Sequence, residues 1–392
     1  MSSAKSRPEA AQVVGLFPAL SGFGGIQEAS RQTLHALRNI LAQRNFSGAY
    51  LGLNDPLGSQ IAQAEAPVQT KDDAIPFTGY QRSKFRFVLQ ALRLARKNPL
   101  IIIAAHVNLA VVAQWMKRIS PRTKTIVLCH GVEVWDALPA NRRSALLAAD
   151  IILCPSTYTA SKVSTIQNVP RDKIRVLPWP INSEVLRMAQ AKSNLAPPPG
   201  FPQGPVILTV GRWASAERYK GADDLIRAMP QLRASFPGLS LVTVGGGDDL
   251  PRLKAIAAEL QIADSVHFFQ GISRERLAAC YAHSEIFALP STGEGFGIVF
   301  IEAMAFGLPV VGVAAGGLTD IIRDGTNGFL VPAKDPAALA DSLARLLSDP
   351  SLRSEMGRNG AETINQRYRF PLFEKSLQQI LLECGLDSVS ST

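Results

Sequence analysis

The sequence predicts an α/β protein made of two doubly wound, Rossmann-like domains that face each other across a cleft. Short β-branched runs alternate with amphipathic segments along most of the chain, which is typical of βαβ units around a parallel sheet. The Pro-rich stretch LAPPPGFPQGP at residues 195–205 divides these runs into two series. With 392 residues, the chain also exceeds the roughly 250 to 300 residues at which a single hydrophobic core stops growing.

The two series predict five and six strands. The strands of the first series are VVGLF (13–17), LIIIAA (100–105), TIVLC (125–129), IILC (151–154) and IRVL (174–177). Those of the second are VILTV (206–210), LVTV (241–244), VHFF (266–269), IFAL (286–289), VVGV (310–313) and GFLV (328–331). We therefore expect an N-terminal, acceptor-side domain at 13–185, a linker at 186–205 and a C-terminal domain at 206–368.

Both ends of the chain fall outside these domains. Residues 1–12 resemble a disordered tail, although Lys5 and Arg7 ahead of an apolar stretch leave a cleaved signal peptide as an alternative. Residues 369–392 include a helical pattern from Phe370 to Cys384, which could pack back on the N-terminal domain. No apolar run approaches the ~20 residues that a membrane-spanning helix needs.

Composition excludes several classes of protein. The four cysteines are scattered singly, without a CxxC pair or a spacing that suggests zinc, so we expect a reduced, cytoplasmic protein. Charge is divided unevenly: residues 1–180 carry 22 Lys+Arg against 10 Asp+Glu, whereas residues 181–392 carry 19 against 22. Only the N-terminal half should attract anionic partners, and the chain contains no motif for nucleic-acid recognition.

The stretch TGEGFGIVFIEAMAFGLPV (292–310) predicts an anion-binding loop. It follows the predicted strand IFAL, and it leads through Gly295 into a helix at about 297–306. The carboxyl end of a parallel strand and the start of a helix are where α/β sheets bind anions. The N–H groups of Phe296, Gly297 and Ile298 are placed to bond phosphate oxygens.

Two carboxylates flank this helix start. Glu294 precedes the helix, and Glu302 lies inside its apolar run, where an unpartnered charge would cost several kcal/mol. Carboxylates accept sugar hydroxyls well, so a ligand with a central phosphate and hydroxyl groups at both ends would satisfy them. The alternative is structural, with Glu294 as a capping residue and Glu302 as a buried acid bonded to an arginine.

A second loop, GRWASAERYKG (211–221), follows the strand VILTV. Its Arg212 and Lys220 could clamp a diphosphate, and a solvated surface loop is the alternative. The segment VGGGDDLPRLK (244–254) is half of a dinucleotide fingerprint and lacks the third glycine. A plain glycine turn, or a loop near a nucleotide, fits it better than an NAD site.

Together these motifs resemble the E-x7-E signature of retaining glycosyltransferases with the GT-B fold, in particular glycosyltransferase family 4. The resemblance covers most of the chain, and the order of its pieces is specific. These pieces are SGFGGIQE near the start, HGVEVW at 130–135, GR with KG at 211–221, GEGFGIVFIEAMAFGLPVV with Glu294 and Glu302, and GG with DGTNGFLV at 316–331.

The resemblance implies a role for each matching residue. Arg212 and Lys220 would bind the diphosphate of the donor, Glu302 the ribose, and Glu294 the hydroxyls of the donor sugar. His130 would reach the sugar being transferred. The resemblance further implies that backbone groups at Gly271 and Ile272 contact the nucleobase. It also implies that backbone groups at Gly24 and Gly25, in the N-terminal domain, contact the phosphates.

The residues alone leave the roles of two histidines open. A structural histidine is the alternative for His130, and His106 could border the acceptor or serve packing alone. His35, His267 and His283 look structural.

The sequence contains no DxD triplet, which is a common metal clamp for a nucleotide diphosphate. We therefore expect no metal and no cofactor, with Arg212, Lys220 and the helix start at Gly297 neutralising the leaving diphosphate. The resemblance implies retention of the anomeric configuration. A front-face route needs no protein nucleophile, and Glu294 as a covalent nucleophile is the alternative.

Cations alternate with apolar residues in QRSKFRFVLQALRLARKNP (81–99). A helix with this pattern can lie on an anionic membrane surface, so we expect association with the inner face of the cell membrane, and an ordinary basic surface helix is the alternative.

The resemblance therefore implies a retaining, metal-independent hexosyltransferase. It would move a sugar from a nucleotide-diphosphate sugar to a carbohydrate or lipid-linked acceptor, in the biosynthesis of a cell-surface polysaccharide or glycolipid. The alternatives are another GT-B nucleotide-sugar enzyme, of the epimerase or glycogen-synthase type, a non-catalytic nucleotide-sugar-binding protein, and a dehydrogenase.

Overall fold

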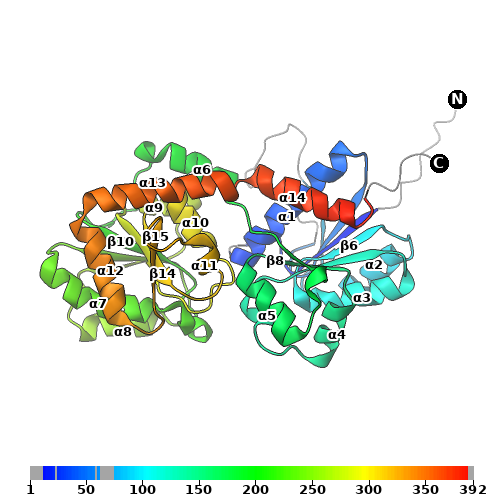
Figure 1. The fold of residues 1–392 in the computed structure, drawn as a ribbon, viewed down its shortest axis with the longest axis horizontal. Coiled ribbons are helices and arrows are strands. Elements are labelled where there is room, and N and C mark those ends of the chain that lie inside the picture. Colours follow the sequence, from blue (N-terminus) through cyan, green and yellow to red (C-terminus); the bar gives the residue numbers. More distant parts are fainter. Residues whose placement is uncertain (1–11, 23, 58–59, 62–74, 387–392) are drawn as a thin grey trace. The chain divides into compact units, whose positions relative to one another are not determined.

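A computed structural model of the protein describes residues 12–22, 24–57, 60–61 and 75–386 (Figure 1). The chain divides into two units. The first contains the chain up to Pro180 together with the segment that starts at Phe370, and the second runs from Ile181 to Arg369. Each unit is built on a parallel sheet with helices, which confirms the predicted class of two Rossmann-like α/β domains. The predicted tail lies outside the described residues except for Gln12.

The first unit ends before the linker predicted at residues 186–205. That stretch begins inside helix α6 (Ser183–Gln190), which belongs to the second unit. The side chain of Asn182 caps this helix, because its Oδ1 accepts the N–H of Glu184 at 2.8 Å. Within residues 186–205, a short 3-10 helix at Lys192–Asn194 follows α6, and the Pro-rich part at 195–205 contains neither helix nor strand.

The first unit contains a seven-stranded parallel sheet with the order β5-β2-β1-β6-β7-β8-β9. Its strands are β1 (Val13–Phe17), β2 (Gly48–Gly52), β5 (Thr78–Gly79), β6 (Ile101–Ala104), β7 (Lys124–Leu128), β8 (Ile151–Cys154) and β9 (Ile174–Val176). A separate antiparallel pair consists of β3 (Gln60–Ile61) and β4 (Ile75–Pro76). The five predicted strands are present. The sequence did not predict β2 and β5, because GAYLG is only partly apolar and TG has two residues.

Helices cover both faces of this sheet because a parallel sheet buries both of its surfaces. The helices are α1 (Gly25–Gln43), α2 (Lys84–Ala95), α3 (Ala110–Ile119), α4 (Ala140–Ala148), α5 (Thr157–Gln167) and α14 (Phe370–Glu383). Helices α2 to α5 share one hydrophobic core with β1, β6, β7 and β8. The C-terminal α14 packs beside α1 (Figure 1), and Asn39 of α1 donates to Glu374 of α14 at 2.7 Å.

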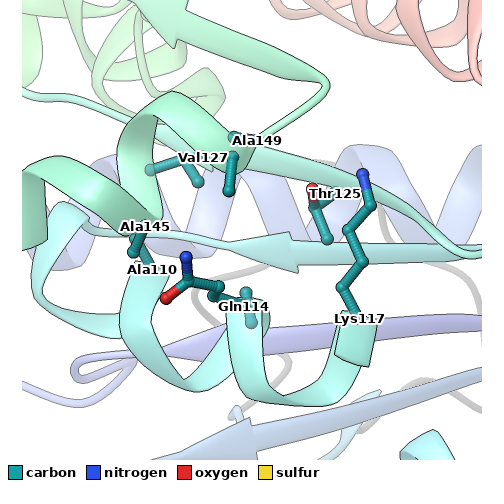
Figure 2. Close-up of a pocket in the computed structure, with 9 residues that line it drawn as sticks. Ala110, Gln114, Lys117, Thr125, Val127, Ala145 and Ala149 are labelled. Carbon is teal, nitrogen blue, oxygen red and sulfur yellow. The ribbon is translucent and has the colours of Figure 1, made fainter. Parts of the chain in front are cut away.

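Figure 2 shows a small gap between α3 and α4 over β7. Its labelled lining residues are Ala110, Gln114, Lys117, Thr125, Val127, Ala145 and Ala149. Lys117 pairs with Asp150, directly before β8, so this gap lies toward the amino ends of the strands. Doubly wound sheets bind ligands at the opposite edge, and we interpret the gap as loose packing between small side chains.

The second unit contains a six-stranded parallel sheet with the order β12-β11-β10-β13-β14-β15. Its strands, all six predicted, are β10 (Val206–Val210), β11 (Ser240–Val244), β12 (Val266–Phe269), β13 (Ile286–Leu289), β14 (Val310–Val313) and β15 (Gly328–Val331). Besides α6, its helices are α7 (Ala222–Ser235), α8 (Leu250–Glu259), α9 (Arg274–Ala282), α10 (Ile298–Ala305), α11 (Leu318–Ile321), α12 (Pro336–Ser348) and α13 (Pro350–Arg367). Within the described ranges, no helix of either unit has the length and apolarity that a bilayer span requires.

In each sheet the strand order reverses beside the first strand of the unit. In the first unit β1 lies between β2 and β6, and in the second β10 lies between β11 and β13. The loops that leave β1 and β6, or β10 and β13, therefore run to opposite faces of their sheet. Ligands of doubly wound folds bind at the carboxyl ends of the strands at such a switch point.

Candidate functional site

The two loops at the switch point of the second unit, together with the helix α10 that follows the second loop, contain most of the residues predicted to bind a ligand. The loop after β10 includes Arg212 and Lys220, and the loop after β13 includes Glu294. The loops are in direct contact. The N–H of Thr292 donates to the carbonyl of Tyr219 at 2.9 Å, and Lys220 Nζ lies 3.0 Å from Glu294 Oε1.

The chain enters α10 through a backbone conformation that requires glycine. Gly297 has φ 107 and ψ 55, and a Cβ at this position would lie 2.7 Å from Leu318. In the described part of the chain, the N–H groups of Phe296, Gly297 and Ile298 donate to no acceptor. The start of α10 therefore keeps three open donors at the place where the sequence predicts an anion site.

The ion pair between Lys220 and Glu294 is mostly shielded from water, because their side chains are only 16% and 14% exposed. Tyr219 forms one wall around it, with Lys220 Nζ 5.6 Å from its ring centroid. The ring packs on Gly293, where a Cβ would approach a ring atom to 2.5 Å. The pair is therefore held in place before any ligand arrives, and its reduced contact with water strengthens the attraction between the two charges.

Arg212 is held differently. Its side chain is 72% exposed and forms an ion pair with Glu217 of the same loop. Surface pairs of this kind contribute little, about 0 to 1 kcal/mol, so Arg212 can exchange partners easily. Glu217 was not among the predicted site residues, because charges five residues apart in an irregular loop give no periodic signal.

The segment VGGGDD supports the Arg212 loop. The N–H of Trp213 donates to the carbonyl of Gly246, and the N–H of Asp249 donates to the carbonyl of Trp213, each at 2.9 Å. The Asp248 carboxylate accepts from the N–H of Ser215 at 2.8 Å and from its hydroxyl at 2.6 Å. The segment therefore forms a glycine turn that fastens a neighbouring loop, which is one of the two interpretations favoured from the sequence.

Glu302 accepts a hydrogen bond from a tyrosine inside the second unit. The hydroxyl of Tyr281, on α9, donates to Glu302 Oε2 at 3.0 Å, and the Tyr281 ring stacks on Phe306 with centroids 5.4 Å apart. Burial and the neighbouring Glu302 charge raise the pKa of Tyr281 well above its usual value, so its hydroxyl keeps its proton and donates. Glu302 is half-buried, and this partner stabilises its charge.

Sequence reasoning missed Tyr281. It lies 21 residues before Glu302 on another helix, and its ring contacts with Phe287 of β13 and with Phe306 place its hydroxyl at the carboxylate. A tyrosine in the middle of CYAHSE gives no periodic or motif signal.

Gly271 and Ile272 follow β12 at the same edge of the sheet, and Gly271 has φ 61. Two strands, β11 and β10, separate β12 from β13. Within the described residues, no hydrogen bond or ion pair joins Gly271 or Ile272 to the Lys220 and Glu294 cluster.

In the first unit, Gly24 and Gly25 lie at the start of α1, after the loop that leaves β1. Asp55, which is fully buried, fixes this loop. Its carboxylate accepts the N–H of Leu20 at 3.0 Å and the N–H of Ser21 at 2.7 Å. Asp55 was not among the predicted site residues, and its effect on the glycine loop depends on a contact between separate segments.

His130 and His106 come together at the carboxyl ends of β7 and β6. Their rings stack with centroids 5.6 Å apart, and the ring of Trp179 also stacks with that of His130, with centroids 5.4 Å apart. Burial, and then the nearby His130, lower the pKa of His106 to about 4, so His106 is neutral at physiological pH. The carboxylate of Glu133 accepts the backbone N–H of His130, which accounts for the glutamate in HGVEVW.

The remaining histidines do not join this group. His35 is buried in α1, where desolvation lowers its pKa to about 4, and His283 bonds the carbonyl of Leu195 in the Pro-rich segment. In the part of the chain that the structure describes, no group of three or more His, Cys, Asp or Glu side chains could hold a metal ion.

Family models match both halves of the chain. The model described as "Glycosyl transferases group 1" matches residues 193–363, and the model described as "Glycosyltransferase Family 4" matches residues 33–185.

Two similar proteins act on inositol compounds, according to their names. The GDP-mannose-dependent alpha-(1-6)-phosphatidylinositol monomannoside mannosyltransferase of Mycolicibacterium smegmatis is 33% identical over 266 residues, which are 64% of this chain and 68% of that protein. The D-inositol 3-phosphate glycosyltransferase of Acidothermus cellulolyticus is 35% identical over 240 residues, 56% of this chain and 52% of the relative. The chain thus matches about half the length of the second relative.

Solved structures share the fold. Sucrose-phosphate synthase from Thermosynechococcus elongatus has a TM-score of 0.74 at 24% identity, covering 97% of this chain and 100% of its own. Anabaena HepE, in complex with UDP, has a TM-score of 0.69 at 18% identity, covering 95% and 100%. At these identities the likeness shows the fold alone.

The bond between Tyr281 and Glu302 gives a prediction for stability. We expect Tyr281→Phe to lower the free energy of unfolding by about 1 to 3 kcal/mol, because it removes a buried donor to a charged group and keeps the ring. In a double-mutant cycle by chemical denaturation, Tyr281→Phe and Glu302→Gln should show a coupling of about 1 kcal/mol. Strictly additive losses would contradict the pairing. Tyr50→Phe is the matched control, since the hydroxyl of this buried tyrosine bonds no acceptor in the described part of the chain.

Proposed function

Because the chain belongs to glycosyltransferase family 4, we propose that the switch point of its second unit binds a nucleotide-diphosphate sugar, whose sugar the enzyme transfers to a carbohydrate or lipid-linked acceptor. One observation carries the proposal: the pair of Lys220 and Glu294 lies beside the open start of α10. A cation, a carboxylate and an anion-binding helix start are thus gathered at a single switch point. A nucleotide sugar has the complementary groups.

The donor's three parts have separate partners in this proposal. Lys220 and the N–H groups at the start of α10 bind the diphosphate, and Arg212 leaves Glu217 to join them. Glu302, oriented by Tyr281, accepts hydroxyls of the ribose, and Glu294 accepts hydroxyls of the sugar. Gly271 and Ile272 border the nucleobase. The roles that the resemblance implies for Gly24, Gly25 and His130 of the first unit stay predictions.

We propose a retaining, metal-independent transfer. The acceptor hydroxyl attacks the anomeric carbon on the face that the diphosphate leaves, the bond from this carbon to the phosphate oxygen breaks, and the hydroxyl proton passes to that oxygen. Lys220, Arg212 and the start of α10 stabilise the negative charge that develops on the leaving group. The ion pair of Glu294 with Lys220 supports a sugar-binding role for Glu294 over a nucleophilic one.

The names of the relatives favour a lipid-linked or polyol acceptor. One acts on a phosphatidylinositol mannoside and another on an inositol phosphate. Cell-surface polysaccharide or glycolipid biosynthesis is consistent with both. Release of nucleoside diphosphate that depends on the acceptor supports a transferase, release without an acceptor indicates a hydrolase or epimerase type, and binding without release indicates a non-catalytic binder.

An exposed aromatic residue of the first unit supports association with an anionic membrane on the cytoplasmic side. Phe85, in the first turn of α2, is 78% exposed and stands between the exposed cations Lys84 and Arg86. An aromatic side chain flanked by cations can insert at the level of the lipid headgroups while the cations bind anionic lipid. The first turn of α2 lies at the carboxyl edge of the sheet, on the side of His130.

Loss of the donor-binding groups should abolish efficient transfer. We expect Lys220→Ala and Glu302→Ala each to lower kcat/KM by about a hundredfold or more, because each removes a buried charged contact with the donor. Steady-state release of nucleoside diphosphate measures this effect. Arg233→Ala is the control, since Arg233 pairs with the exposed Asp264 on the same unit and should change the rate less than about twofold. Near-normal turnover in both site variants would rule out the assignment.

Membrane binding should depend on the first turn of α2. We expect the variant Lys84→Glu/Phe85→Ser/Arg86→Glu to co-sediment with phosphatidylserine-containing vesicles several-fold less than wild type, since about 1 kcal/mol per cation is lost near an anionic surface. The control, Lys254→Glu/Arg358→Glu on the second unit, makes a similar charge change at exposed positions. Equal binding to vesicles with and without anionic lipid would refute the membrane proposal.

A further inference from the structure

Four charged side chains form a network beside the loop that contains Lys220. Arg252 lies at its centre. Two of its nitrogens donate to the Asp249 carboxylate, Nε to Oδ1 at 2.9 Å and Nη2 to Oδ2 at 2.6 Å, and Nη1 donates to Asp223 Oδ2 at 3.0 Å. Arg218 pairs with the same Asp249 carboxylate at 3.0 Å. Asp249 is only 5% exposed, and a two-point contact of this kind is both strong and directional.

The network joins the two ends of the loop at residues 211–221. Arg252 lies in the first turn of α8, and Asp249 directly precedes this helix. The N–H of Asp249 donates to the carbonyl of Trp213 at 2.9 Å, which ties the beginning of the loop to the network. Asp223 lies in the first turn of α7, the helix that the loop enters. Arg252 therefore links the start of α7 to the start of α8.

Lys220 lies where this link is most effective. Gly221 follows it with φ 70, and a Cβ on Gly221 would lie 2.5 Å from the carbonyl oxygen of Pro290. Asp223, which Arg252 holds, comes three residues after Lys220. The backbone between Lys220 and Asp223 is a tight turn into a helix, so a fixed Asp223 leaves Lys220 little freedom. Lys220 and Arg252 also line the same small gap, which places the network close to the stem of the lysine.

The central position requires an arginine. Hydrogen bonds from Arg252 lower the pKa of Asp249, and those to Asp249 and Asp223 raise the pKa of Arg252, so Arg252 and Asp249 are both charged at neutral pH. The planar guanidinium bonds two carboxylates at once. A lysine has a single charged nitrogen and cannot reproduce the two-point contact with Asp249 while it also bonds Asp223.

We propose that Arg252 is a positioning residue of the donor site, which holds the start of α7 against α8 and thereby fixes Lys220 where its ammonium group binds the diphosphate. Arg252 does not itself touch the donor. The inference rests on the proposed function and deepens it, because it separates the residue that binds the diphosphate from the residue that sets its position. Arg212 is largely exposed and can swing toward a ligand, so its contribution depends less on the network.

Hydrogen–deuterium exchange tests the structural half of this proposal without any ligand. Arg252→Met keeps the length of the side chain and removes its charge. We expect it to accelerate exchange of the amides of Gly221 and Leu225, which are hydrogen-bonded at the start of α7, by about tenfold or more. The control is Arg233→Met, which breaks a two-point contact with Asp264 on the same helix α7 and should leave both amides unchanged. Unchanged exchange of both amides in Arg252→Met would overturn the proposal even if transfer of a sugar is demonstrated.

Binding tests the functional half, with the nucleoside diphosphate that wild type binds most tightly among UDP, GDP and ADP. Arg252→Met should weaken this binding by about fivefold or more, because it loosens the lysine that contacts the diphosphate. In a double-mutant cycle with Lys220→Ala, the loss caused by Arg252→Met should fall below about twofold, since its effect passes through Lys220. Equal losses in the presence and absence of Lys220 would refute the positioning role.

Two further measurements separate positioning from general damage to the second unit. Affinity for the corresponding nucleoside should change less than about twofold in Arg252→Met, and a loss as large as that for the nucleoside diphosphate would contradict the proposal. Arg252→Lys retains a cation and should lie between wild type and Arg252→Met in both exchange and binding. If wild type binds none of the three nucleoside diphosphates, the proposed function fails, while hydrogen exchange still decides whether Arg252 holds the loop.

Discussion

The ion pair between Lys220 and Glu294 joins the two loops that diverge from the switch point of the second unit. Neighbouring residues hold both members of this ion pair in place. Tyr219 lies beside Lys220 and packs on Gly293, and the N–H of Gly317 donates to the carbonyl of Glu294 at 2.8 Å. The start of α10 is thereby held next to a fixed positive charge. An anion that reaches this place meets donors whose positions are already set, so little reorganisation is needed.

The two cations of this site differ in a way that follows from exposure. Lys220 is shielded and fixed, while Arg212 is largely exposed and paired with Glu217 on a flexible side chain. An exposed pair contributes little, so a diphosphate bound as proposed, which carries more charge than one carboxylate, would compete well with Glu217 for Arg212. Under the proposed function, Lys220 would define the site and Arg212 would exchange Glu217 for the ligand. The GGGDD turn keeps the backbone under Arg212 in place throughout.

Much of the fold could be predicted because the core strands are continuous apolar runs. All six strands of the second sheet appear where the sequence places them, whereas β2 was missed because its glycines leave it only partly apolar, and β5 because it has two residues. Lys220, Glu294 and the start of α10 were predicted as site residues from motifs at strand ends. Tyr281, Asp55, Glu217 and Trp179 were not, since each acts through a contact between separate segments or within an irregular loop. Partners of this kind have no periodic signature along the chain.

The central claim is that a nucleoside diphosphate binds at the switch point of the second unit through Lys220. Calorimetric titration of UDP, GDP and ADP into wild type and Lys220→Ala, with the corresponding nucleosides as a comparison, tests it most directly. The account predicts that wild type prefers one nucleoside diphosphate, that Lys220→Ala weakens its binding by at least about tenfold, and that binding of the nucleoside alone changes little. Equal affinity of wild type and Lys220→Ala for that nucleoside diphosphate, or no binding of any of the three, would contradict it.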